Sequence, residues 1–139
     1  MRFWDSSGIL PLLVPETCTE DAAALMRSDH DFAIWWATPV ECVAALTRLV
    51  RDRKFDEAAL DKSLLRLDAL VERGSVIEPS AAVREQARRL LRVHPLRAAD
   101  ALQLAAAVAM RGPGAHRAHI VTYDQRLATA ARREGFTVN

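Results

Sequence analysis

The chain has 139 residues, half of them apolar and 27% charged, a composition that fits one globular domain with a single core and excludes a disordered or fibrous chain. The formal net charge of +1 excludes a global basic field, so nucleic-acid binding would depend on a local patch. No apolar run approaches the ~18–20 residues of a membrane span and the first residues lack the apolar core of a secretion signal, so we expect a soluble, cytoplasmic protein.

The two cysteines, Cys18 and Cys42, both lie in segments with a helical pattern. Neither belongs to a Cys-x-x-Cys pair or to a cysteine and histidine set with the spacing of zinc ligands. We therefore expect two reduced thiols in the core and no zinc site.

Short apolar runs alternate with longer amphipathic ones along the chain. Runs rich in aromatic and β-branched residues predict five strands: residues 2–4, 32–36, 75–77, 119–122 and 136–138. Helical spacing of apolar residues predicts the helices: residues 6–14, 19–28, 38–53, 56–73, 79–93, 97–111 and 124–134. Strands separated by helices require right-handed crossovers, which indicates one α/β domain over residues 1–139 with a parallel sheet covered on both faces.

Acidic side chains occur where several of these strands end. Asp5 immediately follows the first strand, Glu41 lies in the first turn of the helix after the second strand, and Asp124 lies just past the fourth strand. Ligands of open parallel sheets bind outside the carboxyl ends of the strands. Asp100 lies in the first turn of helix 97–111, which is otherwise almost wholly apolar, and a buried carboxylate there needs a partner or a metal ion.

Each acid also has a purely structural interpretation. Asp5 and Asp124 could cap the helices that follow them. Thr38 and Glu41 fit a capping box, and the negative charge of Asp100 could simply stabilise its helix by interacting with the positive end of the helix dipole. Four carboxylates at one sheet edge without a matching lysine would nevertheless repel one another unless a divalent cation joined them.

Oxygen ligands of this kind suit Mg²⁺ or Mn²⁺. Such ions activate water and neutralise developing charge in phosphodiester hydrolysis, so no side-chain nucleophile or catalytic histidine is needed. We therefore expect the four histidines to be surface or loop residues: His30, His94, His116 and His119.

Four segments resemble the motifs of the PIN-domain family of nucleases, in the family's order. They are FWDSS (residues 3–7), TPVECVAAL (38–46), LRAADALQLA (96–105) and VTYDQRL (121–127). The third and fourth segments are the most specific, and the resemblance covers nearly the whole chain. At this length, without added domains, the chain resembles a VapC-type ribonuclease toxin of a type II toxin–antitoxin system.

This resemblance implies a three-layer α/β/α fold whose five parallel strands lie in the order 3-2-1-4-5. It implies an endoribonuclease that depends on one or two Mg²⁺ or Mn²⁺ ions, forms a homodimer and is neutralised by a small VapB-like antitoxin. Asp5, Glu41, Asp100 and Asp124 correspond to the family's acidic quartet. Asp5 and Asp100 are expected to bind the metal directly and Asp124 to complete the site directly or through water, while Glu41 would position the water or a second ion.

Other residues near the acidic edge are expected to support this chemistry. Ser6 and Thr122 would hold the carboxylates through their hydroxyl groups. Arg48 and Arg97 could contact RNA phosphates, although each could equally form an ordinary ion pair. Gln103 stands where relatives often have histidine, and we expect it to affect substrate contacts.

Two apolar features allow more than one interpretation. Trp36 could stack an unpaired base at the edge of the cleft, or Trp35 and Trp36 could both be sheet core. The leucine stripe of residues 56–73 either packs on its own domain or, with residues 38–53, lines a groove or dimer surface where an antitoxin helix would lie.

Three other function classes are weighed against the nuclease. A PIN-like module that binds RNA or a protein without cleaving remains the alternative. A response regulator needs adjacent acids after the first strand and a late lysine, whereas Asp5 is followed by two serines and no lysine occurs after Lys62. An aspartate-nucleophile phosphatase needs a D-x-D motif at the same place, so both of these classes are excluded.

Overall fold

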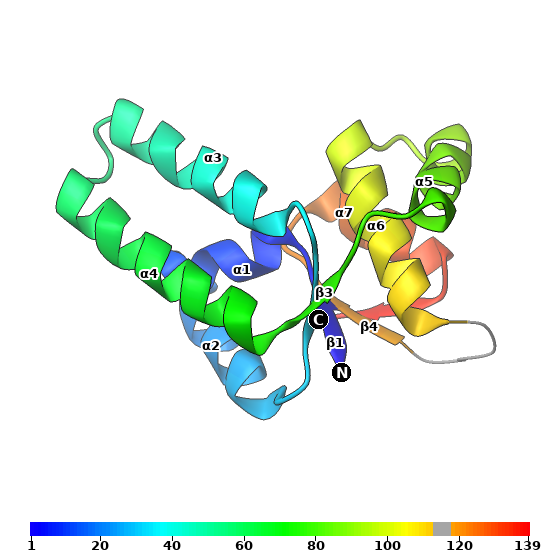
Figure 1. The fold of residues 1–139 in the computed structure, drawn as a ribbon, viewed down its shortest axis with the longest axis horizontal. Coiled ribbons are helices and arrows are strands. Elements are labelled where there is room, and N and C mark those ends of the chain that lie inside the picture. Colours follow the sequence, from blue (N-terminus) through cyan, green and yellow to red (C-terminus); the bar gives the residue numbers. More distant parts are fainter. Residues whose placement is uncertain (113–117) are drawn as a thin grey trace.

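A five-stranded parallel sheet forms the centre of the computed structural model, which describes residues 1–112 and 118–139. The strands are β1 (Arg2–Trp4), β2 (Ala33–Trp35), β3 (Ser75–Ile77), β4 (Ala118–Val121) and β5 (Phe136–Val138). They pair in the order β3-β2-β1-β4-β5, and each neighbouring pair is parallel (Figure 1). The predicted strand order is therefore confirmed.

Seven helices lie between these strands in the described part of the chain. They are α1 (Ser6–Leu13), α2 (Thr19–Ser28), α3 (Thr38–Arg51), α4 (Glu57–Arg73), α5 (Ala81–Val93), α6 (Ala98–Arg111) and α7 (Gln125–Arg133). Each predicted helix and strand is present, with ends that match or differ by at most two residues. The displacement at α4 and α7 arises because the predicted ranges included the capping residues Asp56 and Asp124.

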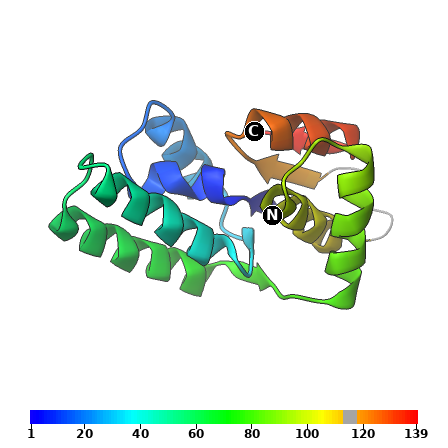
Figure 2. The ribbon, with the colours of Figure 1, turned by 90° about the horizontal axis from the view of Figure 1, so that it is seen from above.

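The sheet separates two apolar cores, because successive strand residues point to opposite faces. Trp4 packs with α1, α2, α3 and α4 on one face, whereas its neighbour Phe3 packs with α5, α6 and α7 on the other. Figures 1 and 2 show the two groups of helices on either side of the sheet. The predicted three-layer α/β/α architecture is confirmed. Each of the helices α1 to α7 is too short or too polar to span a lipid bilayer.

Some local predictions were wrong. The N-cap of α3 is Ala37, with no side-chain cap, so the capping box of Thr38 and Glu41 does not form. The Thr38 side chain is instead buried, and its hydroxyl bonds with the Gln103 side chain. Cys42 is buried as expected, but Cys18 lies half-buried just before α2 and is not a core thiol.

His94 lies in the loop after α5, in agreement with the prediction of a surface or loop position, but its side chain is buried. Its Nε2 lies 2.7 Å from Oε1 of Glu134, whose other oxygen accepts a hydrogen bond from Arg89. This cluster joins the end of α5 to the end of α7. His30 is exposed and His119 is partly exposed, in agreement with the prediction, and His116 lies outside the described residues.

We predict that the Glu134 cluster makes stability depend on acid pH. Burial alone would raise the pKa of Glu134, but hydrogen bonds from Arg89 and His94 outweigh it, so the pKa lies below its ordinary value of 4.5. A carboxyl whose pKa is lower in the folded state stabilises the fold above its unfolded pKa, and this stabilisation is lost as pH falls through the folded pKa. Glu134→Gln should therefore cost about 1–3 kcal/mol at pH 7 and progressively less towards pH 3.

Urea unfolding of wild type and Glu134→Gln at both pH values measures this difference. Glu85→Gln is the matched control, because Glu85 is an exposed carboxylate that also pairs with an arginine. A difference between wild type and Glu134→Gln that stays constant with pH would contradict the assignment.

Candidate active site

Asp5 is the first residue after β1 and is only 3% exposed. Its Oδ1 accepts a hydrogen bond from the Gly8 N–H at 2.9 Å, so Asp5 caps α1. Gly8 makes this position possible, because a Cβ there would lie 2.6 Å from the carbonyl oxygen of Val121 in β4. Burial raises the pKa of Asp5 to about 7, although hydrogen bonds from Gly8 and Ser7 act in the opposite direction.

Ser7 connects Asp5 to the end of β4. Its hydroxyl donates to the Asp5 carboxylate, whose oxygens lie 2.9 and 3.0 Å away, and it lies 3.1 Å from the Thr122 hydroxyl. The same oxygen accepts from the backbone N–H groups of Tyr123 at 2.8 Å and Asp124 at 3.1 Å. Sequence reasoning named Ser6 and Thr122 but missed Ser7. Its position in the same first turn as Asp5 is the signal that could have found it.

Asp124 and Asp100 occupy the starts of two neighbouring helices. Asp124 caps α7 by accepting from the Leu127 N–H at 2.8 Å. Asp100, in the first turn of α6, accepts from the Arg97 N–H at 3.4 Å. Burial and, next, the negative charge of Asp124 raise the pKa of Asp100. The two carboxylates therefore lie within electrostatic reach of each other.

Glu41, in the first turn of α3, is held through one of its two oxygens. Its Oε2 accepts from the Ser6 hydroxyl at 2.7 Å and from Nε2 of Gln103 at 3.0 Å. The Cys42 thiol beside it is buried. Burial raises the pKa of this thiol to about 12, with further contributions from the charges of Glu41 and Asp5. Cys42 therefore stays protonated, and it lies within the electric field of both acids.

The hydrogen bonds link three of the predicted acids into one region. Asp5 and Asp124 share Ser7, and Glu41 is bound by Ser6, the residue next to Asp5. Asp100 joins this region electrostatically through Asp124. Over residues 1–112 and 118–139, however, no three histidine, cysteine, aspartate or glutamate side chains lie close enough together to hold a metal ion. The side chains thus gather at one sheet edge without forming a closed ligand cage.

This donor set fits a hard divalent cation. Mg²⁺ is usually bound by one or two carboxylates and several waters rather than by a protein cage. Two of the acids, Asp5 and Asp100, have raised pKa values, so added positive charge would stabilise the carboxylate form of both. The arrangement is therefore compatible with Mg²⁺ or Mn²⁺ held by few direct ligands.

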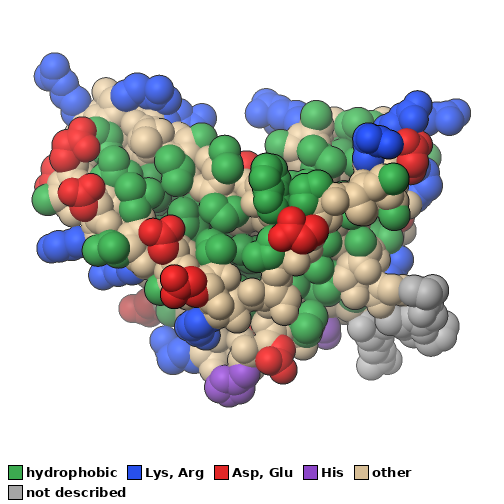
Figure 3. Space-filling view, viewed as in Figure 1, with side chains coloured by type: hydrophobic (Ala, Val, Ile, Leu, Met, Phe, Trp, Pro, Cys, Tyr) green, Lys and Arg blue, Asp and Glu red, His purple; other side chains and the backbone are tan. Residues whose placement is uncertain are grey.

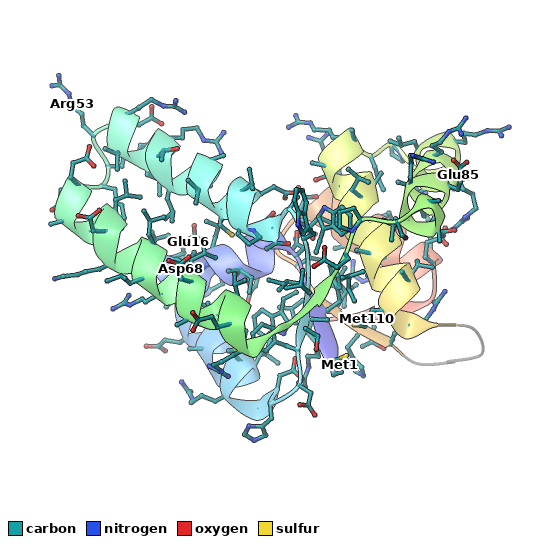
Figure 4. All side chains as sticks on the ribbon, viewed as in Figure 1. Met1, Glu16, Arg53, Asp68, Glu85 and Met110 are labelled. Carbon is teal, nitrogen blue, oxygen red and sulfur yellow. The ribbon has the colours of Figure 1, made fainter. Side chains whose placement is uncertain are left out.

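The acidic edge lies at the base of a hollow between two arms of the molecule. One arm is the α3–α4 hairpin, and the other is formed by α5 and α6 (Figure 1). Figure 3 shows apolar side chains towards the base of this hollow and basic side chains on both of its rims. Arg53, at the outer end of the hairpin, and Glu85, on α5, mark the opposite sides in Figure 4.

A family model for the PIN domain matches residues 3–133. The chain belongs to the PIN-domain family. It is 32% identical over 137 residues to two Mycobacterium tuberculosis proteins, Ribonuclease VapC45 and Ribonuclease VapC49, and the matches cover 98% of this chain and 92% of each relative.

Several solved structures share this fold. A toxin–antitoxin complex from Klebsiella pneumoniae contains a chain with a TM-score of 0.70 and 16% identity, over 99% of this chain and 96% of that one. VapC20 from Mycobacterium tuberculosis, described as a sarcin–ricin loop cleaving toxin, has a TM-score of 0.70 and 18% identity, over 94% of this chain and 95% of that one. At these identities the likeness shows the shared fold.

The other candidate residues of this PIN domain fall into two groups, those with exposed side chains and those with buried ones. Arg48 and Arg97 are exposed, and Trp36 is 53% exposed. Trp35 is only 4% exposed and belongs to the sheet core. Gln103 is 1% exposed, so the prediction that it contacts RNA was wrong. Its amide is used inside the protein, because Gln103 lies on the face of α6 that points towards α3.

We predict that removing the charge of Asp5 stabilises the metal-free PIN domain. The folded-state pKa of Asp5 is about 7, against an ordinary value of 3.8. Because the folded state keeps its proton longer, wild-type stability should fall as pH rises from about 4 to about 7. Asp5→Asn keeps an oxygen that can accept from the Gly8 N–H but has no charge to bury. It should be more stable than wild type at pH 8 by at least about 1 kcal/mol, the equivalent of one pKa unit.

Denaturant unfolding in EDTA across this pH range tests the prediction. Asp56→Asn is a suitable control, because Asp56 also caps a helix, α4, but is exposed. Parallel pH profiles for wild type and Asp5→Asn would show that burial of this charge does not destabilise the fold.

Proposed function

We propose that this PIN domain is a metal-dependent endoribonuclease that acts as the toxin of a toxin–antitoxin pair. The observation that carries the proposal is the placement of Asp5, Glu41, Asp100 and Asp124 at one edge of the sheet, with raised pKa values at Asp5 and Asp100. The 32% identity to proteins named as VapC ribonucleases supports RNA as the substrate.

The roles proposed for the acids follow from their contacts. Bound Mg²⁺ or Mn²⁺, as one or two ions, would lower the pKa of a coordinated water and offset charge on the scissile phosphate. Asp5 and Asp100 would hold the ion, with Asp124 completing the site directly or through water. Glu41 has its Oε2 occupied by internal donors, which leaves Oε1 to orient the attacking water or accept its proton.

A non-cleaving module that binds RNA or a protein is the second candidate. It is favoured by one observation, namely that the described residues contain no ready-made group of three metal ligands. The two candidates differ only in whether the acidic edge binds a catalytic ion, so a cleavage assay separates them.

We predict that the chain cleaves single-stranded RNA in Mg²⁺ or Mn²⁺ and not in EDTA. Asp100→Asn should lower the rate by at least about 100-fold, because the ion would lose a charged ligand. Asp68→Asn, at an exposed position on α4 (Figure 4), is the control and should cleave like wild type. Absence of cleavage by well-folded wild type with either ion would favour the non-cleaving module, and cleavage that survives EDTA would exclude the metal mechanism.

RNA contacts are proposed for three exposed residues around the acidic edge. Arg48 and Arg97 would bind phosphates, one from each side of the hollow, since they lie on α3 and just before α6. Trp36 lies between the end of β2 and the start of α3 and would stack an unpaired base. Its backbone N–H donates to the Ile77 carbonyl at 3.1 Å, which holds this segment against β3.

The proposed stacking by Trp36 can be measured through tryptophan fluorescence. Trp4 and Trp35 are 0% and 4% exposed, so RNA that quenches emission by direct contact must reach Trp36. We predict quenching when the Asp100→Asn protein is titrated with single-stranded RNA, and loss of that quenching in Trp36→Leu. Binding should weaken by about 1–3 kcal/mol in Trp36→Leu and not in Leu65→Ala, which alters an exposed apolar residue of α4. Unchanged quenching in Trp36→Leu would refute this role.

The antitoxin is proposed to bind along the side of α4 that faces α1 and α2. The leucine stripe of α4 mainly packs on its own domain, with Leu60 and Leu67 buried. A groove of about 340 Å³ lies instead between α4 and α1–α2. Its apolar lining includes Leu12, Met26 and Leu70, and three arginines line it as well: Arg27, Arg66 and Arg73. This chemistry suits an amphipathic antitoxin segment with acidic side chains.

A homodimer is proposed through the apolar face beside β3. An open pocket of about 550 Å³ lies there and is lined by Trp35, Pro79 and Leu102 among others. The buried Nε1 of Trp35 has no hydrogen-bond partner within residues 1–112 and 118–139. A second copy covering this face would bury its apolar surface.

A further inference from the structure

Gln103 forms a polar link between the two helical layers. It lies on α6, one turn after Asp100, and its Nε2 donates to Oε2 of Glu41 at 3.0 Å and to the Thr38 hydroxyl at 3.1 Å. Both of these partners are in the first turn of α3. Because α3 and α6 cover opposite faces of the sheet, this link passes over the carboxyl edge of the strands.

The link determines which oxygen of Glu41 is free. A carboxylate oxygen has two lone pairs, and Oε2 already accepts from Ser6 at 2.7 Å and from Gln103 at 3.0 Å. These two donors come from different layers of the fold and approach the same atom. Both lone pairs of Oε2 are therefore used inside the protein, and Oε1 is the oxygen available for a contact in the hollow.

We propose that Gln103 is a positioning residue, which orients Glu41 so that only its Oε1 can make a contact in the hollow. This arrangement excludes Glu41 as a bidentate metal ligand and assigns it to a single water or a single contact. The carboxamide of Gln103 is suited to this task because it is an uncharged donor that leaves the charge of Glu41 in place. The proposal rests on the nuclease function proposed above and adds a residue that touches neither RNA nor metal.

A double-mutant cycle of Gln103→Leu and Glu41→Gln tests the proposal. Gln103→Leu should lower kcat for RNA cleavage by at least about ten-fold and change KM by less than about two-fold, since Gln103 acts only through Glu41. In the Glu41→Gln background the same substitution should leave kcat unchanged. Gln103→His, which keeps a ring N–H donor, should restore part of the loss.

A measurement without activity provides a second test. The Tm changes of Gln103→Leu and Glu41→Gln in EDTA should be non-additive in the double variant, because the first removes the hydrogen bond between residues 103 and 41 and the second weakens it by removing the charge of the acceptor. Ser63→Ala is the matched control for structural damage, because Ser63 is a buried residue on α4 whose hydroxyl bonds the Leu13 carbonyl at 2.8 Å. It should lower Tm and leave kcat unchanged.

The outcomes separate this proposal from the function on which it rests. If wild type does not cleave RNA, the nuclease function fails, and additive Tm changes would then also overturn the link between Gln103 and Glu41. If wild type cleaves but the two substitutions lower kcat independently, the nuclease function stands and the positioning role of Gln103 is wrong. If Ser63→Ala lowered kcat as much as Gln103→Leu, the effect of Gln103→Leu would reflect structural damage, and the positioning role of Gln103 would also be wrong.

Discussion

The burial of the Asp5 carboxyl group is the constraint on which the acidic edge depends. Asp5 and Asp29 are both 3% exposed, but their surroundings differ. Asp29 lies 3.5 Å from the Arg2 guanidinium and accepts from the Trp4 indole N–H at 2.9 Å, whereas the groups that bond the Asp5 carboxylate are all neutral. Neutral donors do not cancel a buried charge. The molecule therefore has a place at the end of β1 where a cation would be stabilised.

The strand order explains why the other acids reach this place. β1 lies between β2 and β4, so the segments that follow these three strands begin side by side at the carboxyl edge. Asp5, Glu41 and Asp124 each come from one of these segments. Gly8 allows α1 to approach the Val121 carbonyl closely, and this approach brings Ser7 to the backbone of residues 123 and 124. A larger residue at position 8 would separate Asp5 from Asp124.

The sequence was sufficient to predict what depends on local pattern and chain order. Strand alternation and helical spacing identified the elements, and the resemblance of four segments to PIN-domain motifs implied the sheet order. The sequence could not show contacts between segments that are distant along the chain. Ser7 contacts the residues after β4 because α1 packs there, and His94 is buried where it contacts Glu134. The Thr38 capping box was wrong for the same reason, since a partner on α6 competes for that hydroxyl.

In the proposed function, the distribution of charge links metal binding to RNA binding. Basic side chains on the rims of the hollow attract phosphates, but the carboxylates at its base repel them at short range. A divalent ion bound between Asp5 and Asp100 would offset the charge of these two carboxylates and so weaken this repulsion. The phosphate could then approach the acids only when the metal is present. RNA bound only by the rims would stay at a distance from Glu41. RNA binding could therefore occur without the ion, but cleavage would still require it.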